Sequence, residues 1–121
     1  MELSSLNKTW ILDVDGTIVK HNGYKIDGQD TLLDGVTGFF NTLSPNDKVI
    51  LLTARKGEYL ENLKKFLVEN NIRYDYILTD MPMGERILVN DKKPSGLNMA
   101  FAINKKRDEK LEINYFINGD L

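Results

Sequence analysis

The stretch Trp10-Ile11-Leu12-Asp13-Val14-Asp15-Gly16-Thr17 (WILDVDGT) decides the fold that this sequence predicts. An apolar run of strand-forming residues ends in two carboxylates two positions apart, and a glycine then permits a sharp turn. Burying acids beside an apolar strand is costly unless a partner offsets their charge. The stretch therefore predicts a strand over residues 10–14 that places Asp13 and Asp15 at a functional edge of a sheet.

The length, net charge and cysteine content of the chain limit the class of protein it can be. A length of 121 residues suits one domain, which we expect to span 1–121. The net charge of −2 argues against a general nucleic-acid binder, which is usually basic. The absence of cysteine excludes disulfides and thiolate sites and fits a reducing compartment. Because the apolar runs are short and the N-terminus lacks a signal-peptide core, we expect a cytoplasmic protein without a membrane partner.

Short apolar runs alternate along the chain with stretches of helical spacing. This alternation predicts an α/β fold, a Rossmann-like parallel sheet of about five strands with helices on both faces. Ligands of such sheets bind at the carboxyl ends of the strands. After residues 10–14, the expected strands span 48–53, 74–79, 86–90 and 112–117, and the expected helices span 31–43, 58–70 and 94–105.

Acidic and hydroxyl side chains stand where several of these strands end. Asp13 and Asp15 follow the first strand, Thr53 ends the second, and Asp91 follows the fourth. A carboxylate can attack phosphorus and form an aspartyl phosphate, while a second carboxylate can donate and accept the proton. Mg²⁺ would offset the repulsion between the acids and bind the phosphate oxygens.

Three motifs in this order carry a family resemblance. DVDGT (13–17), ILLTAR (50–55) and ILVND (87–91) together resemble the haloacid dehalogenase superfamily of phosphotransferases, over roughly residues 10–96. The resemblance implies a Mg²⁺-dependent phosphomonoesterase. It also implies site residues, of which Gly16, Thr17, Ala54, Arg55 and Lys92 are expected to bind substrate.

The catalytic roles follow from the same resemblance. Asp13 is expected to be the nucleophile and a metal ligand, and Asp15 the general acid/base with its backbone carbonyl on the metal. Thr53 would hydrogen-bond the transferring phosphoryl group. Asp91 would complete the metal site together with Asn90, which stands where the family often has a second acid.

A basic residue should balance Asp13 and the phosphate. Small relatives often carry a lysine before a proline shortly ahead of the fourth strand, but Met81 stands there in this chain. Lys93 is the first choice for this cation and Lys92 the second. Arg86 ranks lower, because a strand over 86–90 would start more than about 10 Å from Asp91.

The intervals between motifs are too short for an inserted cap domain. Residues 17–30 would instead form a small flap, with a hairpin around 21–23. Such an open site could be covered by a neighbouring subunit of a homo-oligomer. The run 104–110 (NKKRDEK) is expected to be a solvated loop, and the specificity residues are expected at Lys20, His21, Asn22 and Arg55.

Three functions remain open from the sequence. Small capless relatives often act on sugar or polyol phosphates in surface-polysaccharide assembly, and a small phosphate ester with no nucleic-acid partner is therefore the leading prediction. The alternative enzyme is a phosphatase for nucleotides or nucleic-acid ends. The third is a non-catalytic protein that binds a phosphorylated ligand, which Asn90 and Met81 would favour.

Overall fold

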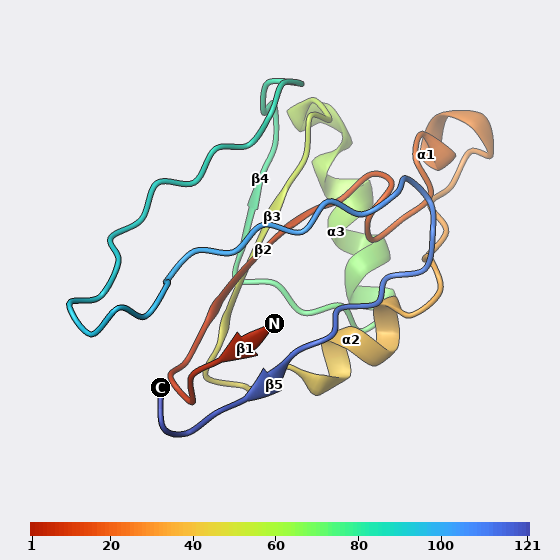
Figure 1. Ribbon diagram of the computed structural model, residues 1–121. Helices are drawn as coiled ribbons and strands as arrows, with labels where there is room; N and C mark the ends of the chain where they lie inside the picture. Colours follow the sequence, from red (N-terminus) through yellow and green to blue (C-terminus); the bar gives the residue numbers. More distant parts are fainter.

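The computed structural model describes residues 1–121 as a small α/β protein with parallel sheets (Figure 1). The chain is regular in its first two thirds and largely extended afterwards. The elements are β1 (Glu2–Leu3), β2 (Thr9–Asp13), α1 (Gly23–Ile26), α2 (Val36–Thr42), β3 (Lys48–Leu52), the 3₁₀ turn η1 (Gly57–Tyr59), α3 (Leu60–Glu69), β4 (Tyr76–Leu78) and β5 (Phe116–Ile117).

The main sheet has three parallel strands in the order β2-β3-β4. In its register Leu12 lies opposite Leu51, and Leu51 lies opposite Ile77. The predicted five-stranded sheet is therefore wrong in extent, although the strands expected near residues 10–14, 48–53 and 74–79 are confirmed. The last predicted strand shortens to β5, which pairs in parallel with β1 as a separate two-stranded sheet.

Helices cover one face of the main sheet. Leu12 and Leu51 point from alternate strand positions into the core, where Leu63 and Leu67 of α3 are fully buried against them. Both α2 and α3 lie on this side of the sheet (Figure 1). On the other face Ile11 stays 47% exposed, and Tyr76 and Leu78 are exposed as well. The expectation of helices on both faces is therefore wrong.

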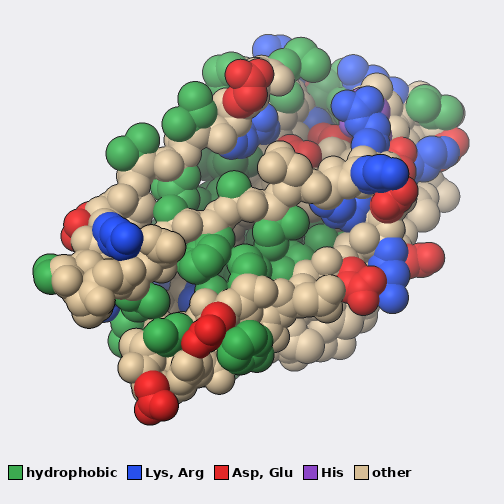
Figure 2. All heavy atoms as spheres, in the orientation of Figure 1, with side chains coloured by type: hydrophobic (Ala, Val, Ile, Leu, Met, Phe, Trp, Pro, Cys, Tyr) green, Lys and Arg blue, Asp and Glu red, His purple; other side chains and the backbone are tan.

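The strand predicted over 86–90 and the helix predicted over 94–105 are absent. A strand needs a pairing partner, but this part of the chain arches away from the sheet, so that Ile87 and Val89 are 84% and 90% exposed (Figure 1). At 93–97 the chain turns instead of starting a helix, because Gly96 adopts a φ of +95° and donates its N–H to the carbonyl of Lys93. Figure 2 shows apolar side chains along this arch and in the hollow beside it.

The hairpin turn predicted around residues 21–23 is absent, although the two ends of the flap pair through an antiparallel bridge between Val19 and Leu32. Residues 23–26 form the single-turn helix α1, whose backbone N–H groups at Lys25 and Ile26 donate to the carbonyl of Asn22. Asn22 takes a left-handed φ of +56° before the helix, so the Asn-Gly pair begins a helical turn rather than linking two strands. No helix in the structure combines the length and apolar character needed to cross a membrane.

Candidate active site

The turn after β2 projects two carboxylates around a buried valine. Val14 is fully buried, and its carbonyl accepts hydrogen bonds from three successive backbone N–H groups, those of residues 17–19. Gly16 closes the turn with a φ of +85° and donates to the carbonyl of Val19 at 2.7 Å. Asp13 and Asp15 flank Val14 on the opposite side of the strand, so both carboxylates leave the core as the sequence predicts.

Asp13 is the more accessible of the two acids. Its side chain is 46% exposed, and its Oδ2 accepts a long hydrogen bond of 3.4 Å from the Thr17 hydroxyl. Its Oδ1 lies 3.6 Å from Nη2 of Arg86. Burial raises the pKa of Asp13 above its usual range, the Arg86 charge opposes this rise, and the nearby Asp15 charge adds to it. Asp13 therefore has an accessible carboxylate with weak internal partners, which suits a nucleophile.

Asp15 is held much more firmly. Both of its oxygens accept hydrogen bonds from Arg55, the shortest at 2.7 Å from Nη2, and Oδ2 also accepts the Thr53 hydroxyl at 3.1 Å. Thr53 is fully buried, and its hydroxyl accepts the backbone N–H of Arg55 at 3.0 Å. The structure thus brings the predicted Thr53 to the site, but its hydroxyl orients Asp15 and makes no direct contact with Asp13.

Arg55 is a buried connector. Its side chain is only 2% exposed and forms paired hydrogen bonds with Asp30 at 2.6 and 3.0 Å, in addition to those with Asp15. Its guanidinium also lies 3.8 Å from the centre of the Tyr24 ring. Burial by itself would lower the pKa of Arg55, but its hydrogen bonds to the carboxylates of Asp30 and Asp15, together with their negative charges, raise it overall. Arg55 is therefore committed to protein partners, and the half-buried Ala54 lies between it and Thr53.

Asp30 and Tyr24 were not singled out from the sequence. Both lie in the polar stretch between the first strand and α2, where an acid and an aromatic residue have many ordinary explanations. Only the fold brings Asp30 to 2.6 Å from the Arg55 guanidinium and places Tyr24 over its face. No spacing or motif in the sequence signals these contacts.

A cavity of about 240 Å³ opens at the DVDGT turn. No hydrophobic residue lines it. Basic residues from far along the chain form one side: Lys105 donates its Nζ to the Gly16 carbonyl at 3.1 Å, and Arg107 packs its stem close to Gly16. The lining residues are Asp13, Asp15, Gly16, Thr17, Lys105 and Arg107.

The run 104–110 is an exposed loop, as the sequence predicts, but its residues 105–108 are anchored to the DVDGT turn. The backbone N–H of Asp108 donates to the Gly16 carbonyl at 3.0 Å, and its carboxylate accepts the backbone N–H of His21 at 2.7 Å. These contacts fasten the segment to the turn that carries the acids. The sequence predicts a solvated loop for such a run of charged residues, because every residue has a backbone carbonyl. The residue types therefore do not show which carbonyl a charged side chain will bind.

The residues predicted to complete a metal site lie elsewhere. Asn90, Asp91 and Lys92 are exposed in the extended arch, and the Asn90 amide donates to the carbonyl of Asp91. No group of three or more acidic or histidine side chains is placed to hold a metal ion. The predicted ligand set of Asp13, Asp15, Asn90 and Asp91 is therefore not assembled, because it depended on a strand over 86–90 that does not form.

The cation that lies beside Asp13 in the structure is neither Lys93 nor Lys92. Lys93 and Lys92 lie at the turn of the arch and make no side-chain contact with Asp13, whereas Arg86 forms an ion pair with it. Arg86 was ranked low on the assumption that residues 86–90 run as a strand. Without that strand, the distance argument against Arg86 no longer applies. Two further bonds from its Nη1, to the carbonyls of residues 82 and 84, hold the side chain in place.

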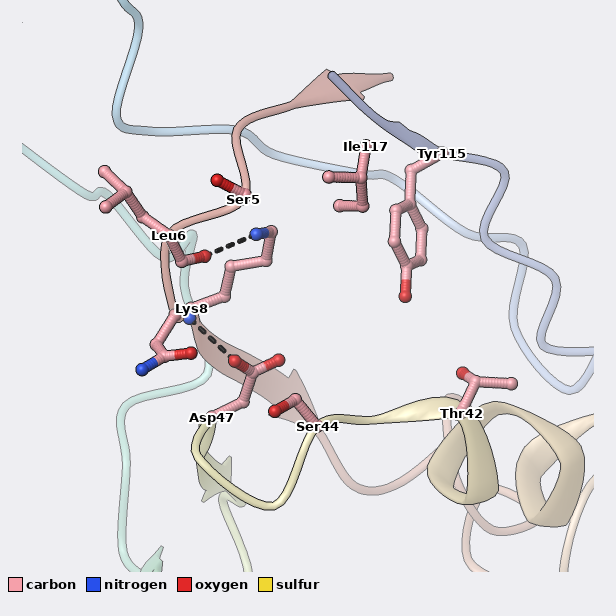
Figure 3. Close-up of a pocket in the computed structure, with 9 residues that line it drawn as sticks. Ser5, Leu6, Lys8, Thr42, Ser44, Asp47, Tyr115 and Ile117 are labelled. Carbon is pink, nitrogen blue, oxygen red and sulfur yellow. Dashed lines mark hydrogen bonds between the residues drawn. The ribbon is translucent and has the colours of Figure 1, made fainter. Parts of the chain in front are cut away.

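A second cavity, of about 250 Å³, lies at the opposite end of the strands (Figure 3). The one acid that lines it, Asp47, is buried and accepts the backbone N–H of Lys8 at 2.8 Å and the indole N–H of Trp10 at 3.0 Å. Both carboxylate oxygens are thus used to join the start of β2 to the loop before β3. The charged residues of this cavity, Lys8 and Asp47, are both hydrogen-bonded within the protein, so they have a structural role and are not free to bind a ligand.

Comparisons with known proteins bear on this site only through solved structures. No protein-family profile and no curated protein matches the chain. A chain in the structure of the Pnkp1/Rnl/Hen1 complex is similar at 32% identity and a TM-score of 0.53, over 69% of this chain and 31% of that one. A second structure, of the Pnkp1/Rnl/Hen1 RNA repair complex, matches at 32% identity and 0.53 over 71% and 30%. This chain spans about a third of the length of the chains it resembles.

Proposed function

We propose that this protein is a phosphatase that removes phosphate from a nucleic-acid end, with Asp13 as the nucleophile. The observation that carries the chemistry is the accessible Asp13 carboxylate, which opens beside Asp15 into a wholly polar cavity containing Lys105 and Arg107. The likeness to a chain of an RNA repair complex supports the substrate class. The sugar-phosphate prediction has no such support.

The charges around the cavity also favour a nucleic-acid substrate, although the net charge of the chain argues against one. The sequence has no basic stripe, but the fold places Arg86, Lys105 and Arg107 around the two acids. Basic side chains also gather at the end of the molecule that carries α1 (Figure 2). Lysine and arginine side chains around the cavity favour a nucleic-acid substrate, because their contacts with its phosphates release bound counterions.

The proposed chemistry uses the residues of the turn. An Asp13 oxygen attacks phosphorus, the bond from phosphorus to the leaving oxygen breaks, and Asp15 gives that oxygen a proton. Water then attacks the aspartyl phosphate, Asp15 takes the proton of the water, and phosphate leaves with the Asp13 carboxylate restored. Because Arg55 occupies both oxygens of Asp15, this cycle requires Arg55 to yield part of its contact when Asp15 is protonated.

The Mg²⁺ requirement stays a prediction from the family resemblance. Of the two acids that line the cavity, only Asp13 offers a carboxylate without strong internal partners, whereas Mg²⁺ sites usually combine one or two carboxylates with waters and substrate oxygens. The predicted multi-residue ligand set does not fit the arrangement described above. Mg²⁺ bound at Asp13 would neutralise charge on the phosphate, and the steps above use only residues of the chain and water.

Phosphate release from defined substrates tests the proposal. RNA and DNA oligonucleotides bearing a 3′- or 5′-terminal phosphate should be compared with sugar phosphates, with and without Mg²⁺. We expect release from oligonucleotides, and a loss of at least about a thousandfold in Asp13→Asn, since a nucleophile cannot be replaced by an amide.

Asp34→Asn is the matched control, because Asp34 is exposed and its carboxylate has no partner. This variant should retain full activity. Release from sugar phosphates alone would reject the nucleic-acid substrate but keep the phosphatase. Activity that survives in Asp13→Asn would reject Asp13 as the nucleophile, and no release from any substrate would favour the non-catalytic binding protein.

A further inference from the structure

Arg107 is the charged group of the cavity that has no protein partner. Its guanidinium takes part in none of the hydrogen bonds or ion pairs of the structure, although it lines the same cavity as Asp13 and Asp15. Its stem is placed by the turn, since its Cγ lies only 3.1 Å from where a Cβ on Gly16 would stand. The aliphatic part of the Arg107 side chain is thus held in place, while its guanidinium is free to bind a ligand.

The other cations near the acids are already engaged. Arg55 is bound between Asp15 and Asp30, and Arg86 divides its guanidinium between Asp13 and two backbone carbonyls. Lys105 donates to the carbonyls of Gly16 and Lys106 at 3.1 and 3.0 Å. A phosphate dianion entering beside two carboxylates needs further positive charge, and Arg107 is the cation lining the cavity whose N–H groups have no partner in the protein.

We propose that Arg107 binds the non-bridging oxygens of the phosphate held against Asp13. A planar guanidinium can donate two parallel N–H groups to phosphate, which gives both attraction and orientation. The ligand class, a terminal phosphate monoester, rests on the proposed function. The residue assignment rests on the free guanidinium in the cavity, and it replaces the role that the sequence gave to Lys93 and Lys92.

Binding of inorganic phosphate tests this assignment without turnover. Titration calorimetry in a buffer containing Mg²⁺ should compare wild type, Arg107→Met and Lys106→Met. Methionine keeps the apolar stem that packs on Gly16 and removes only the guanidinium. Lys106→Met removes the same charge one position away, from an exposed side chain that does not line the cavity.

We expect Arg107→Met to weaken phosphate binding by about tenfold or more, as loss of a charge-assisted hydrogen bond implies. Lys106→Met should stay within about twofold, because a screened charge outside the cavity contributes little. Arg107→Lys should recover part of the affinity but not all of it, since lysine lacks the planar pair of donors. Thermal unfolding of each variant verifies that the turn is intact.

Equal affinities in the two methionine variants would overturn the assignment, and so would undetectable phosphate binding by the wild type. The proposed function fails separately. Phosphate binding that depends on Arg107, in a protein that releases phosphate from no substrate, would keep this inference and reject the enzyme. Phosphate release that depends on Asp13, with phosphate binding and KM unchanged in Arg107→Met, would keep the proposed enzyme and reject the role of Arg107.

Discussion

Residues 9–80 and residues 81–121 differ in what holds them in place. The first region contains the three-stranded sheet and the helices that cover it, and it supplies every buried residue of the core cluster except Leu111. The second region contributes one two-residue strand and a long exposed arch. Buried apolar side chains therefore fix the first region, whereas the second is held by a few apolar contacts near Leu111, by backbone hydrogen bonds and by a few charged contacts.

The candidate site joins these two regions. The carboxylates Asp13 and Asp15 come from the packed region, and the cations Arg86, Lys105 and Arg107 come from the other. The difference between the regions can be measured by pairing a substitution in residues 9–80 with a comparable one in residues 81–121.

The largest difference in stability should separate the two arginines that contact the acids. Arg55→Met leaves the carboxylates of Asp15 and Asp30 buried without their partner, and we expect a loss of about 3–5 kcal/mol in the free energy of unfolding. Arg86→Met removes a 40% exposed arginine at 3.6 Å from Asp13 and should cost less than about 1 kcal/mol. Urea denaturation measures both.

The two denaturation curves should have the same slope, so that midpoints report stability. Equal losses in the two variants would contradict the difference in anchoring between the regions. A loss in Arg86→Met as large as that expected for Arg55→Met would mean that the arch is packed against the turn in solution.

The next effect compares two apolar truncations. Leu63→Ala creates a cavity in the core under α3 and should cost about 2–5 kcal/mol. Val89→Ala removes methyl groups that are 90% exposed and should change stability by no more than about 0.5 kcal/mol. Chemical denaturation again gives both values. A clear loss in Val89→Ala would show that residues 86–90 are buried as the sequence predicts, in a strand that joins the sheet.

The sequence was a good guide where local pattern and burial agree. The run KVILL has apolar residues on both faces and became β3, and the spacing of Leu60, Leu63 and Leu67 became α3. The DVDGT turn was also anticipated, because its glycine and its acids act within a few residues of each other. In each of these elements the information that decides the structure is local.

The sequence was a poor guide where a distant partner decides the outcome. The run RILVN has strand character, but no strand lies beside it, and a one-dimensional pattern does not reveal that. Lys105 is joined to the site by its hydrogen bond to the Gly16 carbonyl, about ninety residues away in sequence, and Arg107 packs beside the same glycine. The sequence pattern reveals neither contact. The cationic half of the site therefore had to be seen in the fold.

The smallest effect separates Asp13 from an ordinary surface acid. Its pKa is raised chiefly by burial, so the unfolded chain ionises first as the pH rises. Stability is unaffected by Asp13 below the unfolded pKa, falls through the interval up to the raised folded pKa, and stays reduced above it. Asp13→Asn removes this loss, and its melting temperature should exceed that of the wild type by a small amount at pH 7 and match it near pH 3. A lower melting temperature than wild type at pH 7 would show that the Arg86 contact outweighs burial, and with it that the arch stabilises the acid pair.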